Sequence, residues 1–322
     1  MASLSFKAST TVDHANDLLV VTCASGKQAT ALLPNLVNQW QRLRLVCNSA
    51  KSEVHLKKVF SKAEVMRADL SLRTEAERVL NDATAIYFVE PPFVPRQAAM
   101  GFNMIDAAKK AAKKGTFKHF VYASVLNPQL RKMLHHHSRL QVEEYLMESE
   151  LNYTILQPTH FMFLFPMGPL LAQEQPVYTA NWNPSVPFSF IALTDLGEVC
   201  AKVLNEREKH YLAQYQLCGD GPLNYRQICD IASKEIGKAI ELRQKTFEEA
   251  VQSFAERMFG SLDTDAESID GIERILLYYN RHGLIGSSNI CEWLLGRKPT
   301  SWLDWMRAEI KQIKQQPNGV DH

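Results

Sequence analysis

The stretch from Leu18 to Pro34 constrains the fold of this chain more than any other. Residues 18–22 form a short run of apolar and β-branched side chains, which is typical of a parallel strand buried on both faces. Small residues follow at 24–26, and from Lys27 onward apolar residues recur at helical spacing. A strand, a turn of small residues and a helix are the opening of a dinucleotide-binding βαβ unit. We therefore expect an α/β fold built on a parallel sheet.

The glycine fingerprint of such a turn is incomplete in this chain. Cys23, Gly26 and Ala29 stand at the positions where three glycines usually set the turn, the approach to a pyrophosphate and the helix packing. Alanine suits the packing position, whereas the Cβ of Cys23 crowds a tight turn. The predicted cofactor contacts at this turn are Thr22, Ala24, Ser25, Gly26, Lys27 and Gln28.

The end of the second predicted strand, at 43–46, bears on the choice of dinucleotide. An acidic residue that binds the ribose of NAD is expected about 20 residues beyond the turn. Asn48 stands there instead, and Lys51 lies close by. An amide does not repel a 2′-phosphate, so NADP is favoured over NAD. The alternative, that Asn48 only ends a strand, stays open.

Strands and helices alternate through residue 160. Further strands are predicted at 63–69, 85–89, 119–124 and 152–157, and helices at 74–80, 96–113 and 135–147. This alternation predicts a doubly wound parallel sheet of the Rossmann type. Because ligands bind beyond the carboxyl ends of such strands, we expect Asp69, Leu70 and Glu90 to complete the cofactor site.

The predicted catalytic residues are Ser124, His135, Arg139 and His160. His135 and Arg139 have the spacing of the Tyr-x-x-x-Lys pair of short-chain dehydrogenases, with both residue types replaced. Imidazole exchanges a proton near neutral pH, and the guanidinium supplies a fixed charge. We expect both side chains at the solvent-facing start of their helix. In the alternative interpretation, Arg139 pairs with Glu143 and His135 caps a loop.

An apolar stretch, 158–166, follows the sixth strand and is rich in Met and Phe. It is equally consistent with core and with the wall of an apolar substrate pocket, into which His160 would reach. The adjacent histidines 135–137 point about 100° apart on a helix and cannot share one ion, so no metal site is predicted.

Charge and composition limit the classes of partner. A formal net charge of +1 gives no electrostatic argument for nucleic acid or an anionic membrane. The six cysteines form no Cys-x-x-Cys pair, and no secretory signal or membrane span is visible, so we expect reduced thiols and a cytoplasmic protein. The expected partner is a small-molecule substrate, and the sequence leaves the oligomeric state open.

The expected organisation is a flexible arm at 1–16, a dinucleotide-binding domain at 17–165 and a smaller, mainly helical substrate lobe at 166–322, with some segments returning to the sheet.

Several segments together resemble the NmrA-like proteins, which are atypical short-chain dehydrogenases numerous in fungi. The segments are 21–28, 120–124, 142–146, 153–161 and 296–301. The resemblance extends from about residue 18 to 306 and implies a Rossmann domain with a small C-terminal substrate lobe. Members include NADP-dependent reductases, dinucleotide-binding regulators and tailoring enzymes of secondary metabolism. This chain departs from the family pattern in keeping only Gly26 of the fingerprint and in having Arg139 where lysine is usual.

Three functions follow as hypotheses. The leading one is an NADP-dependent oxidoreductase that acts on an apolar metabolite in secondary-metabolite biosynthesis. The second is a cofactor-independent isomerase or cyclase, for example one that rearranges an epoxide, with His135, Arg139 and His160 as acid–base groups. The third is a non-catalytic regulator that senses NADP.

Overall fold

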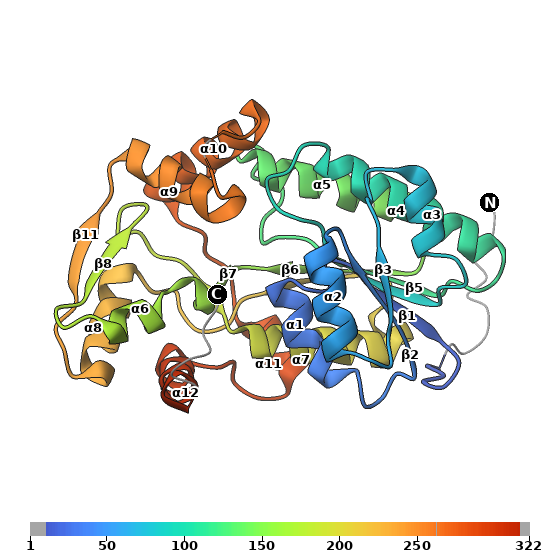
Figure 1. Cartoon of the computed structure of the whole chain (residues 1–322), viewed down its shortest axis with the longest axis horizontal. Helices are drawn as coiled ribbons and strands as arrows, with labels where there is room; N and C mark the ends of the chain where they lie inside the picture. The colour runs from blue at the N-terminus through green and yellow to red at the C-terminus, as the bar shows by residue number, and fades with distance from the viewer. Residues whose placement is uncertain (1–10, 262, 316–322) are drawn as a thin grey trace.

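A parallel sheet forms the centre of the computed structural model, which describes residues 11–261 and 263–315. Within these residues, seven strands pair in the order β10-β6-β5-β4-β1-β2-β3 (Figure 1). Their bounds are β1 (Leu18–Val21), β2 (Arg42–Cys47), β3 (Glu64–Arg67), β4 (Ala85–Phe88), β5 (His119–Ala123), β6 (Tyr153–Pro158) and β10 (Ala213–Leu217). Every pairing is parallel, which confirms the predicted doubly wound sheet.

Strand order reverses between β1 and β4. The chain adds β2 and β3 on one side of β1 and then crosses to β4 on the other side. The two connections therefore leave β1 in opposite directions, and in open α/β sheets this arrangement leaves a crevice beyond the carboxyl ends of the two strands, here β1 and β4. This crevice is where a ligand of an open α/β sheet is expected.

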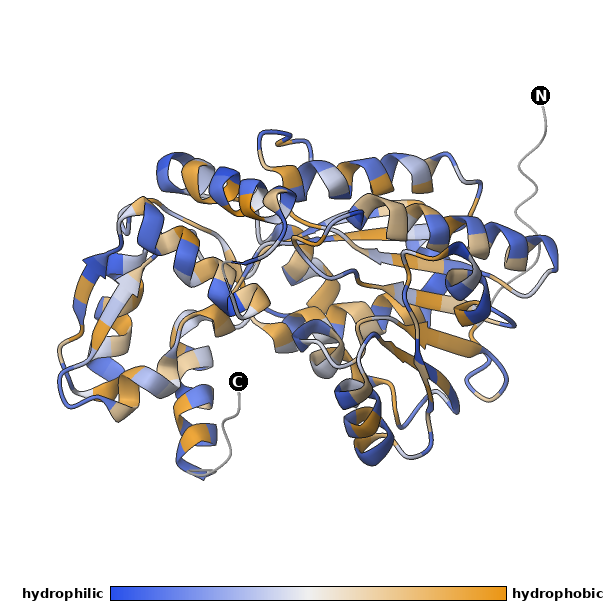
Figure 2. Cartoon of the chain, turned by 45° about the horizontal axis from the view of Figure 1, so that its top comes forward, coloured by the Kyte–Doolittle hydropathy of each residue, from blue (hydrophilic) through white to orange (hydrophobic). Residues whose placement is uncertain are grey.

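Helices cover both faces of the sheet, because successive side chains of a buried strand point to opposite faces. Leu19 and Val21 of β1 pack into one apolar cluster, and Val20 packs into another on the opposite face. The first face is covered by α1 (Lys27–Leu32), α2 (Ala50–Val59), α7 (Leu193–Glu206) and α11 (Asn289–Leu295). The second face is covered by α3 (Arg73–Val79), α4 (Gln97–Lys113) and α5 (Leu134–Met147). The apolar strands between amphipathic helices are visible in Figure 2.

A third apolar cluster is formed mainly by the C-terminal half and includes the almost fully buried Trp302. It is built by α6 (Met167–Ala172), α8 (Tyr225–Ile236), α9 (Phe247–Phe259), α10 (Ala266–His282), α12 (Trp302–Gln315) and a two-stranded parallel sheet of β8 (Val177–Ala180) and β11 (Glu241–Gln244). Capping boxes at Asn224 and Thr246 define the starts of α8 and α9. We call this part the C-terminal lobe; it lies beside the carboxyl edge of the large sheet (Figure 1).

Segments distant in sequence join the sheet. α7 packs on α1, and β10 adds the edge strand beside β6. A short pair, β7 (His160–Phe161) and β9 (Phe190–Ile191), runs between the large sheet and the C-terminal lobe. Of the predicted arm at 1–16, residues 1–10 lie outside the described part. Within the rest of it, His14 packs edge-on against Trp40, and its Nε2 lies 3.1 Å from Oδ1 of Asn205.

Candidate functional site

The turn after β1 is tight and has an unusual residue at its start. Cys23 has a φ of 46°, in the left-handed region that favours glycine. The backbone N–H of Gly26 donates to the Cys23 carbonyl at 2.8 Å. A Cβ added to Gly26 would lie 3.0 Å from that same carbonyl oxygen, so a side chain here would crowd the turn.

The predicted turn contacts divide into inward and outward side chains. The Thr22 hydroxyl donates to the Val89 carbonyl at 2.6 Å and accepts from the Val89 N–H at 2.8 Å, which ties β1 to the end of β4. Ala24 is buried, and Gln28 accepts a hydrogen bond from the Tyr87 hydroxyl at 3.2 Å. The outward set is Ser25, Gly26 and Lys27. Ser25 and Lys27 are exposed, and Gly26 and Gln28 are partly exposed.

A cluster of serine hydroxyls lies beside the turn. Ser52 Oγ is 3.0 Å from Oγ of Ser25 and 3.0 Å from Oγ of Ser49, which also caps the N-terminus of α2. Asn48 and Lys51 are exposed next to this cluster. Ser49 and Ser52 were not predicted as site residues. The signal for them was a serine at the predicted start of a helix, which is typical of an N-cap.

Asp69 and Leu70, the predicted cofactor residues just after β3, differ from each other in exposure. Asp69 is exposed, and its Oδ1 accepts from the backbone N–H of Ser71 at 2.9 Å. Leu70 is buried, and its carbonyl accepts from the side chain of Asn103 on α4 at 3.2 Å. Asp69 is therefore open to a ligand, and Leu70 offers mainly backbone.

Glu90 and Arg139 form an ion pair in the interior. Nη1 of Arg139 donates to Oε1 of Glu90 at 2.7 Å and to the Ala123 carbonyl at 3.2 Å, and Nη2 donates to the Glu90 carbonyl at 3.1 Å. The Arg139 side chain is 5% exposed and that of Glu90 is 0% exposed. The predicted solvent-facing position of Arg139 is therefore wrong. The alternative pairing with Glu143 is wrong as well, because Arg139 pairs with Glu90, and the Glu143 carboxylate accepts from Gln157.

Burial dominates the electrostatics of this pair. It raises the pKa of Glu90, while the Arg139 charge and the Tyr122 hydroxyl, which donates to Glu90 Oε1 at 2.5 Å, oppose that shift. Burial lowers the pKa of Arg139, but the Glu90 charge and Tyr122 together outweigh burial, and the pKa is raised overall. The guanidinium charge is thus neutralised locally by Glu90.

Ser124 follows directly after Ala123 and lies near Glu143. Burial raises the pKa of Glu143, and the Ser124 hydroxyl and the Gln157 amide both oppose the shift. Nε2 of Gln157 donates to both carboxylate oxygens of Glu143, at 2.9 and 3.0 Å. The end of β5 and the end of β6 are therefore joined to α5 by buried polar contacts.

His135 lies apart from the ion pair. Its ring stacks on Phe93 with centroids 4.7 Å apart, and its Nδ1 lies 3.3 Å from Oε1 of Gln97. Burial, and secondarily the Arg139 charge, holds the pKa of His135 well below its usual range, so the ring is neutral at pH 7. Among the described residues, no hydrogen bond joins His135 to Arg139 or Ser124.

His136, one residue further on, reaches across to the C-terminal lobe. Its Nδ1 lies 3.1 Å from the Asn127 carbonyl, which can only accept, so Nδ1 carries the proton. Its Nε2 therefore accepts from the Tyr279 hydroxyl, 3.4 Å away on α10. Burial lowers the pKa of His136 to about 4.

His160 lies in the same region, against aromatic rings. Its ring centroid is 4.9 Å from Tyr279, 4.8 Å from Phe188 and 5.6 Å from Trp182. Burial lowers its pKa to about 3. We call His136, His160, Trp182, Phe188 and Tyr279 the interlobe cluster. Of this cluster, His160 was predicted from the sequence, and His136 was considered only as a metal ligand. Trp182, Phe188 and Tyr279 were not predicted, because no local spacing links them to His160.

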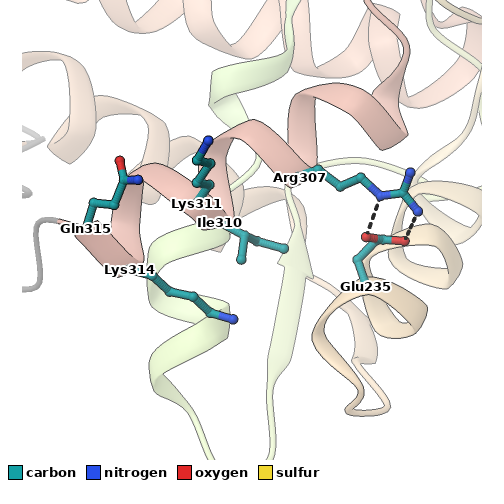
Figure 3. Close-up of a pocket in the computed structure, with 6 residues that line it drawn as sticks. All are labelled: Glu235, Arg307, Ile310, Lys311, Lys314 and Gln315. Atoms are coloured by element: carbon teal, nitrogen blue, oxygen red, sulfur yellow. Dashed lines mark hydrogen bonds and ion pairs between the residues drawn. The ribbon is translucent and has the colours of Figure 1, made fainter.

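One surface groove lies elsewhere, between α12 and α8, with a volume of about 330 Å³ (Figure 3). There, Nε and Nη2 of Arg307 donate to the two carboxylate oxygens of Glu235, at 3.0 and 3.1 Å. The other lining residues are Ile310, Lys311, Lys314 and Gln315. It lies in the C-terminal lobe and not at the carboxyl ends of the large sheet. This groove is therefore separate from the ligand crevice expected beyond β1 and β4.

The described residues contain neither a candidate metal site nor a candidate membrane-spanning helix. Across 11–261 and 263–315, no group of three or more His, Cys, Asp or Glu side chains is placed to hold a metal ion. No helix in the same part of the chain is long and apolar enough to cross a membrane.

Comparison with known proteins identifies the family. The NmrA-like family profile matches residues 15–302. The chain belongs to the NmrA-like family. A curated relative, festuclavine dehydrogenase easG of Aspergillus fumigatus, is 29% identical over 94 residues, which are 28% of this chain and 32% of that enzyme. The match thus spans about a third of the relative.

Solved structures share the fold of this NmrA-like chain. The NADPH complex of the quinone oxidoreductase QOR2 of Escherichia coli has a TM-score of 0.73 at 17% identity, over 91% of this chain and 100% of that one. The NADP(H) complex of triphenylmethane reductase from Citrobacter sp. gives 0.73 at 17% identity, over 90% and 99%. The negative transcriptional regulator Nmra in complex with NAD gives 0.74 at 17% identity, over 95% and 99%. These likenesses confirm the Rossmann-type fold.

Proposed function

We propose that this NmrA-like protein is an NADP-dependent oxidoreductase that acts on an apolar small molecule. The observation that carries the proposal is the position of two features at one edge of the sheet. The exposed turn at Ser25–Lys27 lies at the β1/β4 reversal, and the interlobe cluster lies where the chain leaves β6 for the C-terminal lobe. A nicotinamide cofactor and an apolar substrate are the ligands that fit these two features.

The residues beside the turn fit a dinucleotide with a 2′-phosphate. A Cβ at Gly26 would crowd the turn, and the exposed Lys51 and the hydroxyls of Ser25, Ser49 and Ser52 provide one positive charge and several hydrogen-bond donors. Asn48 places no negative charge there. Ser25, Gly26 and Lys27 would hold the pyrophosphate side, and Asp69 would lie at the outer edge of the site.

Bound NADP(H) would supply the hydride chemistry, and the chain itself would position and bind the substrate. Because Arg139 is buried and paired with Glu90, we assign these two residues to support of the strand ends under the site. Ser124, His135 and His160 remain the proposed catalytic or binding side chains. Of these, His160 has the most apolar surroundings. A substrate from secondary metabolism stays part of the proposal, supported by the partial match to festuclavine dehydrogenase.

Calorimetric titration with NADPH, NADP, NADH and NAD tests the proposal. We expect NADPH and NADP to bind more tightly than NADH and NAD, and Gly26→Val to weaken all four. Turnover is then followed by NADPH absorbance with aromatic ketones and enones. Tight binding without turnover would favour a regulator that senses NADP, and no binding of any dinucleotide would favour acid–base chemistry without a cofactor.

A further inference from the structure

The interlobe cluster contains several hydrogen-bonding side chains, and all of them are uncharged at pH 7. Tyr279 is 5% exposed, and its hydroxyl donates to His136 Nε2 at 3.4 Å. A hydrogen bond of this length is weak, so the hydroxyl can turn to a closer acceptor on a ligand. Nε1 of Trp182 is buried and has no hydrogen-bond partner among the described residues. A buried indole N–H without an acceptor is costly, and such groups call for a partner.

The rings of these residues are in mutual contact. The centroid of Trp182 lies 5.5 Å from that of Tyr279 and 5.6 Å from that of His160, and His160 lies 4.9 Å from Tyr279. Within the described chain, neither ring nitrogen of the half-buried His160 takes part in a hydrogen bond, so its neutral imidazole has one unused N–H. Three neutral donor groups therefore belong to rings that pack against one another.

No cation balances a negative ligand at this place. The titratable groups that face His160 and Tyr279 are His136, Tyr225 and Tyr278, with no lysine or arginine among them in the part of the chain described. The nearest buried guanidinium, Arg139, already pairs with Glu90. An anionic group placed here would lose its hydration without gaining an opposite charge.

We propose that Tyr279, His160 and Trp182 bind the carbonyl oxygen of an uncharged aromatic or apolar compound, and that the site rejects the corresponding carboxylates. The inference rests on the proposed function, since it names the substrate class of that same site. A carbonyl oxygen is an acceptor with two lone pairs, which suits the unpaired N–H groups of Trp182 and His160 and the Tyr279 hydroxyl with its long bond to His136. The aromatic walls stack on the remainder of the ligand.

The test uses two probes of matched shape, 1-acetonaphthone and 1-naphthoate, whose binding to the full chain is measured by calorimetry at pH 7. We expect the ketone to bind at least about 100-fold more tightly than the carboxylate, the scale for an unpaired buried charge. Since His136 and His160 stay neutral above their low pKa values of about 4 and 3, ketone affinity should be constant from pH 5.5 to 8.5.

Variants assign the contacts. Tyr279→Phe keeps the ring and its packing, and we expect it to weaken ketone binding about fivefold to tenfold, the contribution of one hydrogen bond. Tyr278→Phe, at the adjacent half-buried tyrosine whose ring lies against His282, is the matched control and should bind as the wild type does. Melting curves show whether each variant is folded.

The outcomes separate the two proposals. Equal affinity for ketone and carboxylate, no ketone binding, or wild-type ketone affinity in folded Tyr279→Phe would each overturn the inference. If the ketone binds as expected but no dinucleotide binds in the titrations above, the substrate site stands and the oxidoreductase proposal falls.

Discussion

The buried pair of Glu90 and Arg139 gives the sharpest quantitative prediction. Replacing Arg139 by Met fills similar volume but removes three hydrogen bonds, one to the Glu90 carboxylate and two to the carbonyls of Glu90 and Ala123. Glu90 is then left fully buried with the Tyr122 hydroxyl as its remaining donor. Breaking a buried ion pair in this way lowers the free energy of unfolding by about 3–5 kcal/mol.

The loss should depend on pH with a defined sign. Burial raises the folded-state pKa of Glu90 above its ordinary value, and removal of the Arg139 charge raises it further. The folded variant therefore binds its proton more tightly than the unfolded chain does, and its stability falls as pH rises from the ordinary glutamate pKa toward the folded one. Arg139→Met should thus lose more relative to wild type at pH 8 than at pH 5.5, by at most about 1.4 kcal/mol per pH unit.

The assay is urea unfolding followed by far-UV circular dichroism, with wild type, Glu90→Gln, Arg139→Met and the double variant in one cycle. The double variant has no uncompensated charge, so we expect it to be more stable than Arg139→Met alone. A single Arg139→Met substitution that costs less than about 1 kcal/mol would refute the reasoning. So would a double variant whose loss equals the two single losses added together.

Three further predictions follow from the site. Cys23→Gly should leave the free energy of unfolding unchanged or raise it by up to about 1 kcal/mol, because relief of the left-handed φ of 46° offsets the added chain entropy; urea midpoints check this, and a clear loss of stability would contradict it. His136 has a folded pKa of about 4 against 6.5, so the unfolded chain protonates first and stability should fall by about 3 kcal/mol as pH drops from 6.5 to 4. His136→Gln should flatten that part of the stability curve, and an unchanged curve would remove His136 as its cause. Lys51→Glu should weaken NADPH binding about fivefold to tenfold and leave NADH binding nearly unchanged, as measured by calorimetry, since an exposed charge acts mainly on the 2′-phosphate; equal losses for both would argue against the NADP preference.

The sequence by itself predicted the sheet and the place of the ligand crevice. The strands predicted at 18–22, 85–89 and 119–124 lie within one or two residues of β1, β4 and β5. Hydrophobic periodicity and turn residues are local signals, and a buried parallel strand needs both along a few consecutive positions. The alternation of strands with helices then leaves few ways to wind the sheet.

Only the tertiary structure decided what the site side chains contact. Spacing places His135 and Arg139 on successive turns of α5, but the partner of Arg139 is Glu90, 49 residues earlier in the loop after β4. Likewise, His136 meets Tyr279 across 143 residues, at the junction with a lobe whose placement no local pattern specifies. A side chain's pKa and role depend on burial and on long-range neighbours, and the packing of whole elements against one another determines both.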